Sequence, residues 1–227
     1  MCNRYFQPPR ERINFFRILS VPDSYKGGDV FPRGAGGFLR TSENGHDMEL
    51  VMGQWALVPS FAKSKVLSYS TNNARIEGVA TAASYKQAWA HGQRCIIPAD
   101  IFWEPCWESG KNEWWSFRRA DENPWGLAGL WNRWVDRATG EIVESCTMLT
   151  QNADVHPLMR RMHKPDPKLG PDQQDKRSVV ILEADEFERW LCGTVEDAKA
   201  LVKLTPAESF IAESEGQAAS AENGSLF

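Results

Sequence analysis

Short apolar and β-prone stretches recur along most of this chain, and Gly, Pro and Asn residues separate them. Stretches punctuated in this way are typical of β-strands. They occupy residues 46–59, 94–98, 113–118, 125–131, 145–150 and 178–182. The pattern therefore predicts a strand-rich core.

Three segments, 80–91, 184–192 and 194–203, have a helical pattern instead, and Thr194 is a suitable N-cap for the last of them. The glycine-rich segment 27–37 predicts a flexible loop. It lacks the Lys-Ser/Thr ending and the strand–loop–helix context of a phosphate-binding loop, so it predicts no nucleotide site.

The end of the chain differs in composition from the rest. From residue 206 onward it is rich in Ala, Glu, Ser and Gly and has few large apolar side chains. Such a segment cannot bury enough apolar surface to fold. We therefore expect a single α+β domain over residues 1–205, with helices flanking the strands, and a disordered tail over 206–227.

Composition narrows the choice of partners. The 227 residues carry a net charge of −4, which excludes a uniformly basic nucleic-acid wrapper but leaves room for a local basic groove. The ten tryptophans fill a core or stack on bases. Five scattered cysteines fit neither a disulfide framework nor a zinc site, so we expect reduced thiols in the cytoplasm. No apolar run is long enough for a membrane span, and no secretory signal is visible.

The second residue carries the most specific chemistry. If Met1 is removed, Cys2 owns both an α-amine, with a pKa of about 7.7–8.0, and a thiol, with a pKa of about 8.5. Such a 1,2-aminothiol condenses with an aldehyde: the amine forms a Schiff base, and the sulfur then closes a thiazolidine ring. No internal cysteine has this chemistry.

Further polar residues of catalytic type lie in three later segments. The segments are Thr71–Glu77, Arg94–Glu104 and Leu149–Pro165. Taken singly, each residue has an ordinary explanation: Asn73 suits a turn, Arg75 a surface ion pair, and Glu104 the solvated end of a strand. His156 and His163 could each be structural.

Taken together and in this order, the motifs resemble the SOS response-associated peptidase family, whose members process abasic sites in DNA. That family begins Met-Cys-Gly-Arg-Tyr, continues with Asn-Ala-Arg-x-Glu, and has an Arg-Cys segment that ends in Glu. The matching segments are Cys2–Tyr5, Trp55–Ala62, Asn73–Glu77 and Arg94–Glu104, and the resemblance covers residues 1–192. It implies a barrel-like mixed β core.

The chain departs from the family pattern in several places. Asn3 replaces a Gly, and Asn tolerates unusual backbone angles better than most residues. Ile101 replaces another Gly. Pro105 replaces a Trp whose stacking face Trp107 could supply.

The histidine segment departs most. The family's His-x-Arg-Met-Pro corresponds to Met159–Pro165, which has no His two places before Arg161. Either His163 or His156 is then the counterpart. We prefer His163, because it precedes a Lys-Pro pair that stands in for the end of the family motif.

The resemblance implies four catalytic residues. Cys2 supplies the amine and the thiol, and Asn73 orients the amine. Glu104 exchanges protons, with a raised pKa if it is partly buried, and His163 carries a proton near neutral pH.

The resemblance also implies a DNA contact surface. Arg4 and Arg75 would grip phosphates, and the exposed rings among Trp55, Phe61 and Trp103 would stack on bases of a single strand. The expected protein is a monomeric abasic-site processing protein that needs no metal or cofactor. After autoproteolytic removal of Met1, it would crosslink to DNA, with lyase activity in addition.

Two other classes stay open. Class II glutamine amidotransferases also begin Met-Cys-Gly and use the cysteine as an N-terminal nucleophile, although Arg4-Tyr5 and Asn73-Ala74-Arg75 speak against that amidohydrolase class. A non-catalytic module that binds single-stranded DNA is the other alternative.

Overall fold

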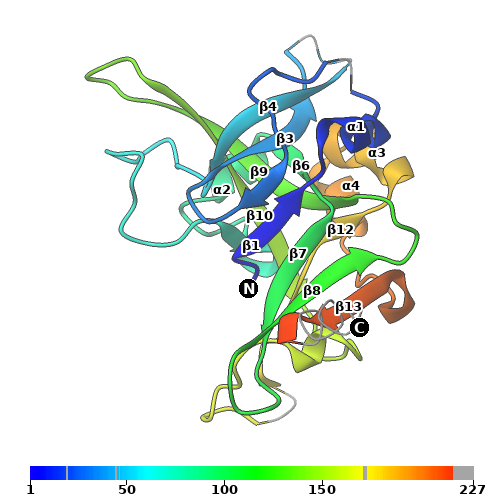
Figure 1. Cartoon of the computed structure of the whole chain (residues 1–227). Helices are drawn as coiled ribbons and strands as arrows, with labels where there is room; N and C mark the ends of the chain where they lie inside the picture. The colour runs from blue at the N-terminus through cyan, green and yellow to red at the C-terminus, as the bar shows by residue number, and fades with distance from the viewer. Residues whose placement is uncertain (19, 44, 46, 171–172, 217–227) are drawn as a thin grey trace.

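Five strands close into a barrel of mixed direction, seen in the upper half of Figure 1. The computed structural model describes residues 1–18, 20–43, 45, 47–170 and 173–216. In the barrel, β10 runs parallel to β4, and every other neighbouring pair is antiparallel. The barrel strands are β3 (Ala35–Thr41), β4 (Met48–Trp55), β6 (Arg94–Ala99), β9 (Trp125–Val135) and β10 (Ile142–Asn152). The expected barrel-like mixed β core is confirmed.

A second sheet of five antiparallel strands lies beside the barrel, in the order β13-β8-β7-β1-β2. Its strands are β1 (Arg4–Gln7), β2 (Gly28–Val30), β7 (Ile101–Cys106), β8 (Glu113–Arg119) and β13 (Phe210–Ser214). Three short strands extend the barrel: β5 (Asn73–Arg75) and β11 (Arg177–Val179) pair with β10, and β12 (Ile181–Leu182) pairs with β9.

Strand alternation divides the interior into two cores. In β6, Cys95 and Ile97 face the core that the barrel shares with the second sheet, whereas Ile96 faces the helices. The helices are α1 (Arg10–Ile13), α2 (Lys86–Ala90), α3 (Phe187–Cys192) and α4 (Val195–Ala200). None of the helices in the described residues is long and apolar enough to cross a membrane.

The predicted strands all form, and the last two predicted helices are confirmed as α3, preceded by a 3₁₀ turn at Ala184–Glu186, and α4. Thr194 caps α4, because its hydroxyl accepts a hydrogen bond from the backbone N–H of Asp197 at 3.0 Å. The predicted helix over 80–91 shortens to α2. Before it, the Thr81 hydroxyl donates to the carbonyl of Gly78, so a side chain competes with helical bonding.

The flexible loop predicted over 27–37 is wrong, because the segment contains β2 and the start of β3. Its glycines serve close packing instead. A Cβ added to Gly36 would lie 2.5 Å from the Tyr5 hydroxyl, and one added to Gly37 would lie 2.9 Å from the Tyr25 ring. The absence of side chains thus lets β1 and Tyr25 pack directly on the barrel.

The predicted boundary after residue 205 differs from the structure. Residues 207–209 form a 3₁₀ turn, and β13 follows it and pairs with β8. Phe210 packs among the rings of Phe102, Phe117 and Trp125, and this aromatic packing anchors β13 to the core. Residues 217–227, the rest of the predicted tail, lie outside the described residues.

Candidate active site

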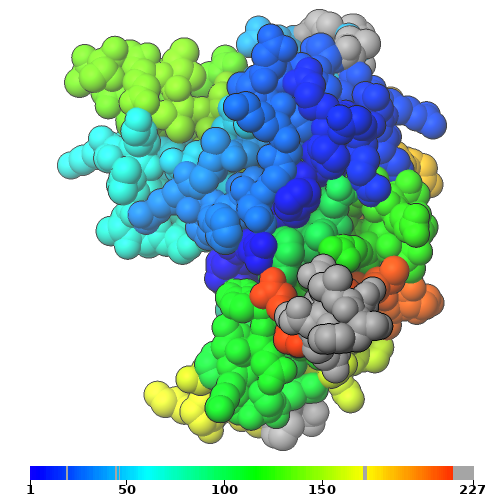
Figure 2. All heavy atoms as spheres, in the orientation of Figure 1, coloured from blue at the N-terminus to red at the C-terminus, as the bar shows by residue number. Residues whose placement is uncertain are grey.

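The first residues of the chain lie where the barrel and the second sheet meet. Figure 2 shows them at the boundary between the light blue barrel strands and the green β7–β8 hairpin. Cys2 lies two residues before the start of β1 and is fully buried, and its thiol donates to the carbonyl of Arg4 at 3.3 Å. A buried residue at position 2 is unusual, because chain termini are normally loosely held.

Two asparagines hold the backbone of Cys2. The Asn73 amide Nδ2 donates to the Cys2 carbonyl at 2.7 Å, and the Asn72 Nδ2 contacts the same oxygen at 3.4 Å. Pairing of β5 with β10 positions Asn73, and the indole of Trp55 donates to the Asn72 carbonyl at 2.8 Å. Asn72 was missed in the sequence, where only its place beside Asn73 could have marked it.

Glu104 lies inside β7 and not at the solvated end of a strand. It is 1% exposed, because strand alternation turns it to the same buried side as Phe102 and Cys106. Its Oε2 atom lies 2.8 Å from His163 Nε2 and 3.5 Å from the α-amine of Met1. The carboxylate therefore joins the histidine to the start of the chain.

Electrostatics set the protonation of this cluster. Burial alone would raise the pKa of Glu104, but the Met1 ammonium and His163 outweigh burial and lower that pKa below its ordinary value. The expectation that the pKa of Glu104 is raised is therefore wrong for the chain that carries Met1. Burial, followed by the charge of Glu104, raises the pKa of the Cys2 thiol well above its usual range. The site thus holds an ionised carboxylate beside a protonated thiol.

The two candidate histidines have different environments. His156 is buried, and its Nδ1 accepts hydrogen bonds from the backbone N–H groups of Leu158 and Met159 at 3.1 and 3.0 Å. Its Nε2 must then donate to the Thr205 carbonyl, 2.8 Å away, so backbone groups satisfy both nitrogens of a neutral ring. His163, in contrast, faces Glu104.

Three side chains of the cluster keep unused hydrogen-bonding capacity. Asn73 Oδ1, Glu104 Oε1 and His163 Nδ1 are buried and have no hydrogen-bond partner among the described residues. Buried polar atoms are almost always paired in folded proteins. Three unpaired atoms around one cysteine therefore mark a place where a polar ligand belongs.

The predicted DNA-contacting residues are two arginines and three aromatic residues, and they differ in exposure. Arg4 lies opposite Trp103 in the β1–β7 register, and its guanidinium covers the Trp103 ring at 4.0 Å. Arg75 is 58% exposed and follows Asn73 in β5. Phe61 is exposed, but no described contact joins it to the cluster. Trp55 is fully buried against Tyr5, and Trp103 is buried beneath Arg4, so the expectation that either ring is exposed to stack on a base is wrong.

The last residue of the Asn-Ala-Arg-x-Glu motif has a structural partner that the sequence does not indicate. Glu77 accepts two hydrogen bonds from Arg177, which is nearly buried at the start of β11. Their separation of 100 residues explains why the pair was missed. In the described part of the chain, no group of three or more His, Cys, Asp or Glu side chains is arranged to hold a metal ion.

The fold and the site define a protein built around a buried cysteine at its second residue. The sequence model of the SOS response associated peptidase (SRAP) family matches residues 1–216, and the chain belongs to this family.

Similar proteins agree with that assignment. The abasic site processing protein YoqW of Bacillus subtilis is 26% identical over 182 residues, covering 78% of this chain and 79% of that protein. The abasic site processing protein HMCES of Xenopus tropicalis is 28% identical over 180 residues, covering 69% of this chain and 49% of that protein. A crystal structure of a protein from Bordetella bronchiseptica is 34% identical with a TM-score of 0.81, covering 94% of this chain and 99% of the other.

Proposed function

We propose that this protein processes abasic sites in single-stranded DNA by forming a covalent thiazolidine between Cys2 and the sugar aldehyde. The observation that carries the proposal is the group of unpaired polar atoms of Asn73, Glu104 and His163 around Cys2. An opened abasic sugar brings a carbonyl and hydroxyl groups that such atoms bind. Family membership and the names of the relatives support the same function.

The proposed reaction begins with the amine. After loss of Met1, the Cys2 amine adds to the aldehyde carbon, and the carbinolamine then loses water to give a Schiff base. The thiol adds to the same carbon and its proton passes to nitrogen, which closes the ring. In total, the aminothiol and the aldehyde give a thiazolidine and one water. The raised pKa of the thiol supports this order, because a protonated thiol is a poor first nucleophile.

Glu104 and His163 would move the protons. The Glu104 carboxylate is suited to accept a proton from the Cys2 amine, since it already lies near the α-amine of Met1. His163, hydrogen-bonded to the same carboxylate oxygen, is suited to protonate the departing hydroxyl. Asn73 holds the Cys2 carbonyl, so the amine is presented in one direction.

Two further activities belong to the proposal. The contact between Glu104 and the Met1 amine supports self-catalysed removal of Met1, although the small side chain at position 2 would also permit an aminopeptidase to act. At the Schiff-base stage, loss of a proton from the adjacent sugar carbon would form a carbon–carbon double bond and break the 3′ carbon–oxygen bond, and the 3′ phosphate would leave with the rest of the strand. That step would be the lyase activity.

Arg4 and Arg75 would bind phosphates of the DNA backbone. Both are already paired, Arg4 with Asp29 and Glu215 and Arg75 with Asp175. A phosphate would replace these carboxylates as the partner, which fits a local groove on an acidic protein. We place the protein in the cytoplasm as a monomer, and its five unpaired cysteines support a reducing compartment.

Intact mass spectrometry tests the proposal. The purified protein should lack the mass of Met1, and incubation with an oligonucleotide containing one abasic site should add the mass of the oligonucleotide less one water. Cys2→Ala should form no stable adduct, whereas Cys192→Ala, which changes an exposed thiol far along the chain, should react like the wild type.

The outcomes separate the alternatives. A stable adduct in Cys2→Ala would place the nucleophile elsewhere and refute the mechanism. If Cys2→Ala binds and protects abasic DNA as well as the wild type, the protein is a non-catalytic binding module. Release of ammonia from glutamine, with no adduct on DNA, would indicate an amidohydrolase.

A further inference from the structure

His163 has an unusual backbone conformation. Its φ angle is +65°, in the left-handed region that residues other than glycine rarely adopt. It follows a short 3₁₀ turn, η3 (Met159–Arg161), and its N–H donates to the carbonyl of Pro105 at 2.6 Å. Such a conformation persists only where surrounding contacts hold it.

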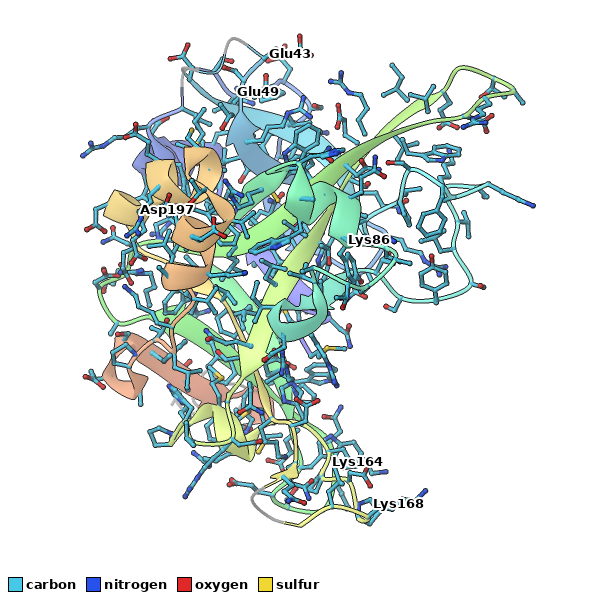
Figure 3. All side chains as sticks on the ribbon, turned by 180° about the vertical axis from the view of Figure 1, so that it is seen from behind. Glu43, Glu49, Lys86, Lys164, Lys168 and Asp197 are labelled. Carbon is cyan, nitrogen blue, oxygen red and sulfur yellow. The ribbon has the colours of Figure 1, made fainter. Side chains whose placement is uncertain are left out.

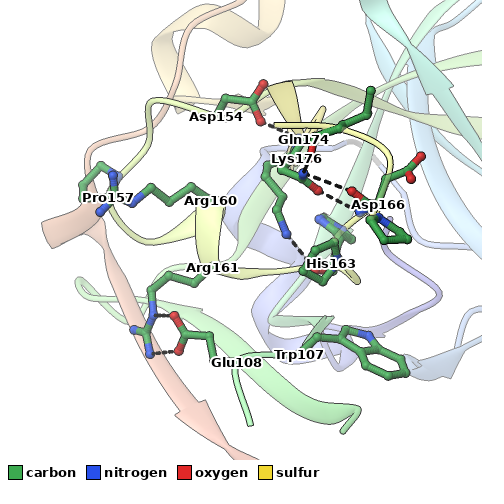
Figure 4. A pocket seen from close by; sticks show the side chains of 13 residues that line it. Trp107, Glu108, Asp154, Pro157, Arg160, Arg161, His163, Asp166, Gln174 and Lys176 are labelled. Atoms are coloured by element: carbon green, nitrogen blue, oxygen red, sulfur yellow. Dashed lines mark hydrogen bonds and ion pairs between the residues drawn. The ribbon is translucent and has the colours of Figure 1, made fainter. Parts of the chain in front are cut away.

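Lys176 supplies those contacts from the other side. Its Nζ donates to the carbonyls of Met162 and His163, both at 2.7 Å, so it holds the backbone on each side of the His163 nitrogen. Figure 4 shows its side chain reaching the backbone of His163 along the wall of a cavity of about 690 Å³. Lys176 is only 8% exposed, and its backbone N–H donates a hydrogen bond to the Asp154 carboxylate at 2.7 Å.

The Lys176 contacts to the backbone around His163 determine how the His163 ring is oriented. The His163 ring meets Glu104 through Nε2 at 2.8 Å, and the orientation of that ring depends on the backbone angles of His163. Twelve residues, 164–175, separate the histidine from the lysine. Without Lys176, that segment would leave His163 tethered on the Pro105 side alone.

We propose that Lys176 is a positioning residue for the abasic-site reaction, because it clamps the left-handed backbone that aims His163 at Glu104. The inference rests on the proposed function for its kinetic consequence. The clamp itself is a property of the folded chain. Lys176 acts through His163 and does not need to contact the DNA.

Single-turnover crosslinking with abasic single-stranded DNA tests the role. Lys176→Met should slow crosslinking by about tenfold or more, since small displacements of catalytic groups have effects of that size. Binding to an oligonucleotide with a tetrahydrofuran analogue, which has no aldehyde, should change by less than about twofold. Lys176→Arg, which keeps donors for both carbonyls, should recover most of the rate.

A matched control removes the same charge nearby. Lys168 lies on the same segment, and Figure 3 shows it at the outer end of the molecule. Its side chain has no described partner, so Lys168→Met should react like the wild type.

The decisive measurement is a double-mutant cycle. If Lys176 acts through His163, Lys176→Met should cause no further slowing in a His163→Gln protein. An equal slowing in both backgrounds, or a wild-type rate for Lys176→Met, would overturn the proposal. If Lys176→Met does not fold, Lys176→Gln, which keeps a single donor group, is judged by the same criteria.

Nuclear magnetic resonance separates this inference from the proposed function. The chain has four histidines, and His163→Gln identifies the imidazole signals of His163. Lys176→Met should shift those signals, and Lys168→Met should not. Unshifted signals would refute the clamp even if crosslinking occurs. Shifted signals in a protein that never crosslinks would support the clamp and refute the function.

Discussion

Replacing Glu104 by Gln exchanges one buried carboxylate oxygen for an amide NH2 group and keeps the side-chain volume nearly constant. The amide oxygen can still accept the hydrogen bond from His163 Nε2, which lies 2.8 Å from the carboxylate in the wild type. The change therefore removes the charge and the proton-accepting ability while keeping the shape of the site.

The two expected magnitudes differ widely. A group that exchanges protons in a reaction contributes about 10²–10⁴ in rate, which is about 3–5 kcal/mol at about 1.36 kcal/mol per factor of ten. The free energy of unfolding should change by only about 1 kcal/mol in either direction. The lost attraction to the α-amine opposes the relief of a desolvated charge.

The assay measures crosslinking in single turnover at saturating abasic DNA, with gel quantification, on protein that lacks Met1. Binding is measured separately with the tetrahydrofuran analogue, and stability by urea unfolding. Glu108→Gln is the matched control, because Glu108 lies just beyond β7 and pairs with Arg161 at 2.8 Å on the surface. It should lose at most about 1 kcal/mol of stability and no crosslinking rate.

One result would refute the reasoning. If Glu104→Gln is folded, binds the analogue and crosslinks within about threefold of the wild-type rate, Glu104 does not carry the proton. Its burial beside His163 would then serve packing alone.

The remaining predictions concern the surroundings of the site. Arg75→Ala should weaken DNA binding and make its salt dependence shallower by about one charge, leaving the rate at saturation unchanged; identical salt slopes would make Arg75 structural. His156→Gln should lower the free energy of unfolding by about 2–3 kcal/mol, because one buried and one partly buried N–H group lose their acceptor, while the folded protein crosslinks normally; a slow but stable variant would exchange the roles of the two histidines. Burial would raise the pKa of Glu77, but hydrogen bonds from Arg177 lower it overall, so its stabilisation is complete above about pH 4.3 and is lost as the pH falls. Urea unfolding between about pH 5 and 3 should therefore be less pH-dependent in Glu77→Gln than in the wild type, and parallel curves would contradict this.

Local patterns in the sequence were enough for most of the regular elements. The apolar runs became β4, β6, β8, β9 and β10, because a strand needs only neighbouring residues that suit a pleated, half-buried surface. The capping signal at Thr194 was equally local, since its hydroxyl and the Asp197 side chain lie three residues apart. The loop predicted over 27–37 and the first part of the predicted tail failed because they contain β2 and β13, which pair with the non-adjacent residues of β1 and β8.

The sequence by itself named the chemical groups of the site, because Cys2, Asn73, Glu104 and the histidines belong to motifs with a recognisable order. Only the tertiary structure decided how they are used. It turned Glu104 inward through the alternation of β7, buried Trp55 away from any base, and placed His163 on Glu104 across 59 residues of chain. Burial and partner choice depend on segments that meet only after folding, whereas motif order is written along the chain.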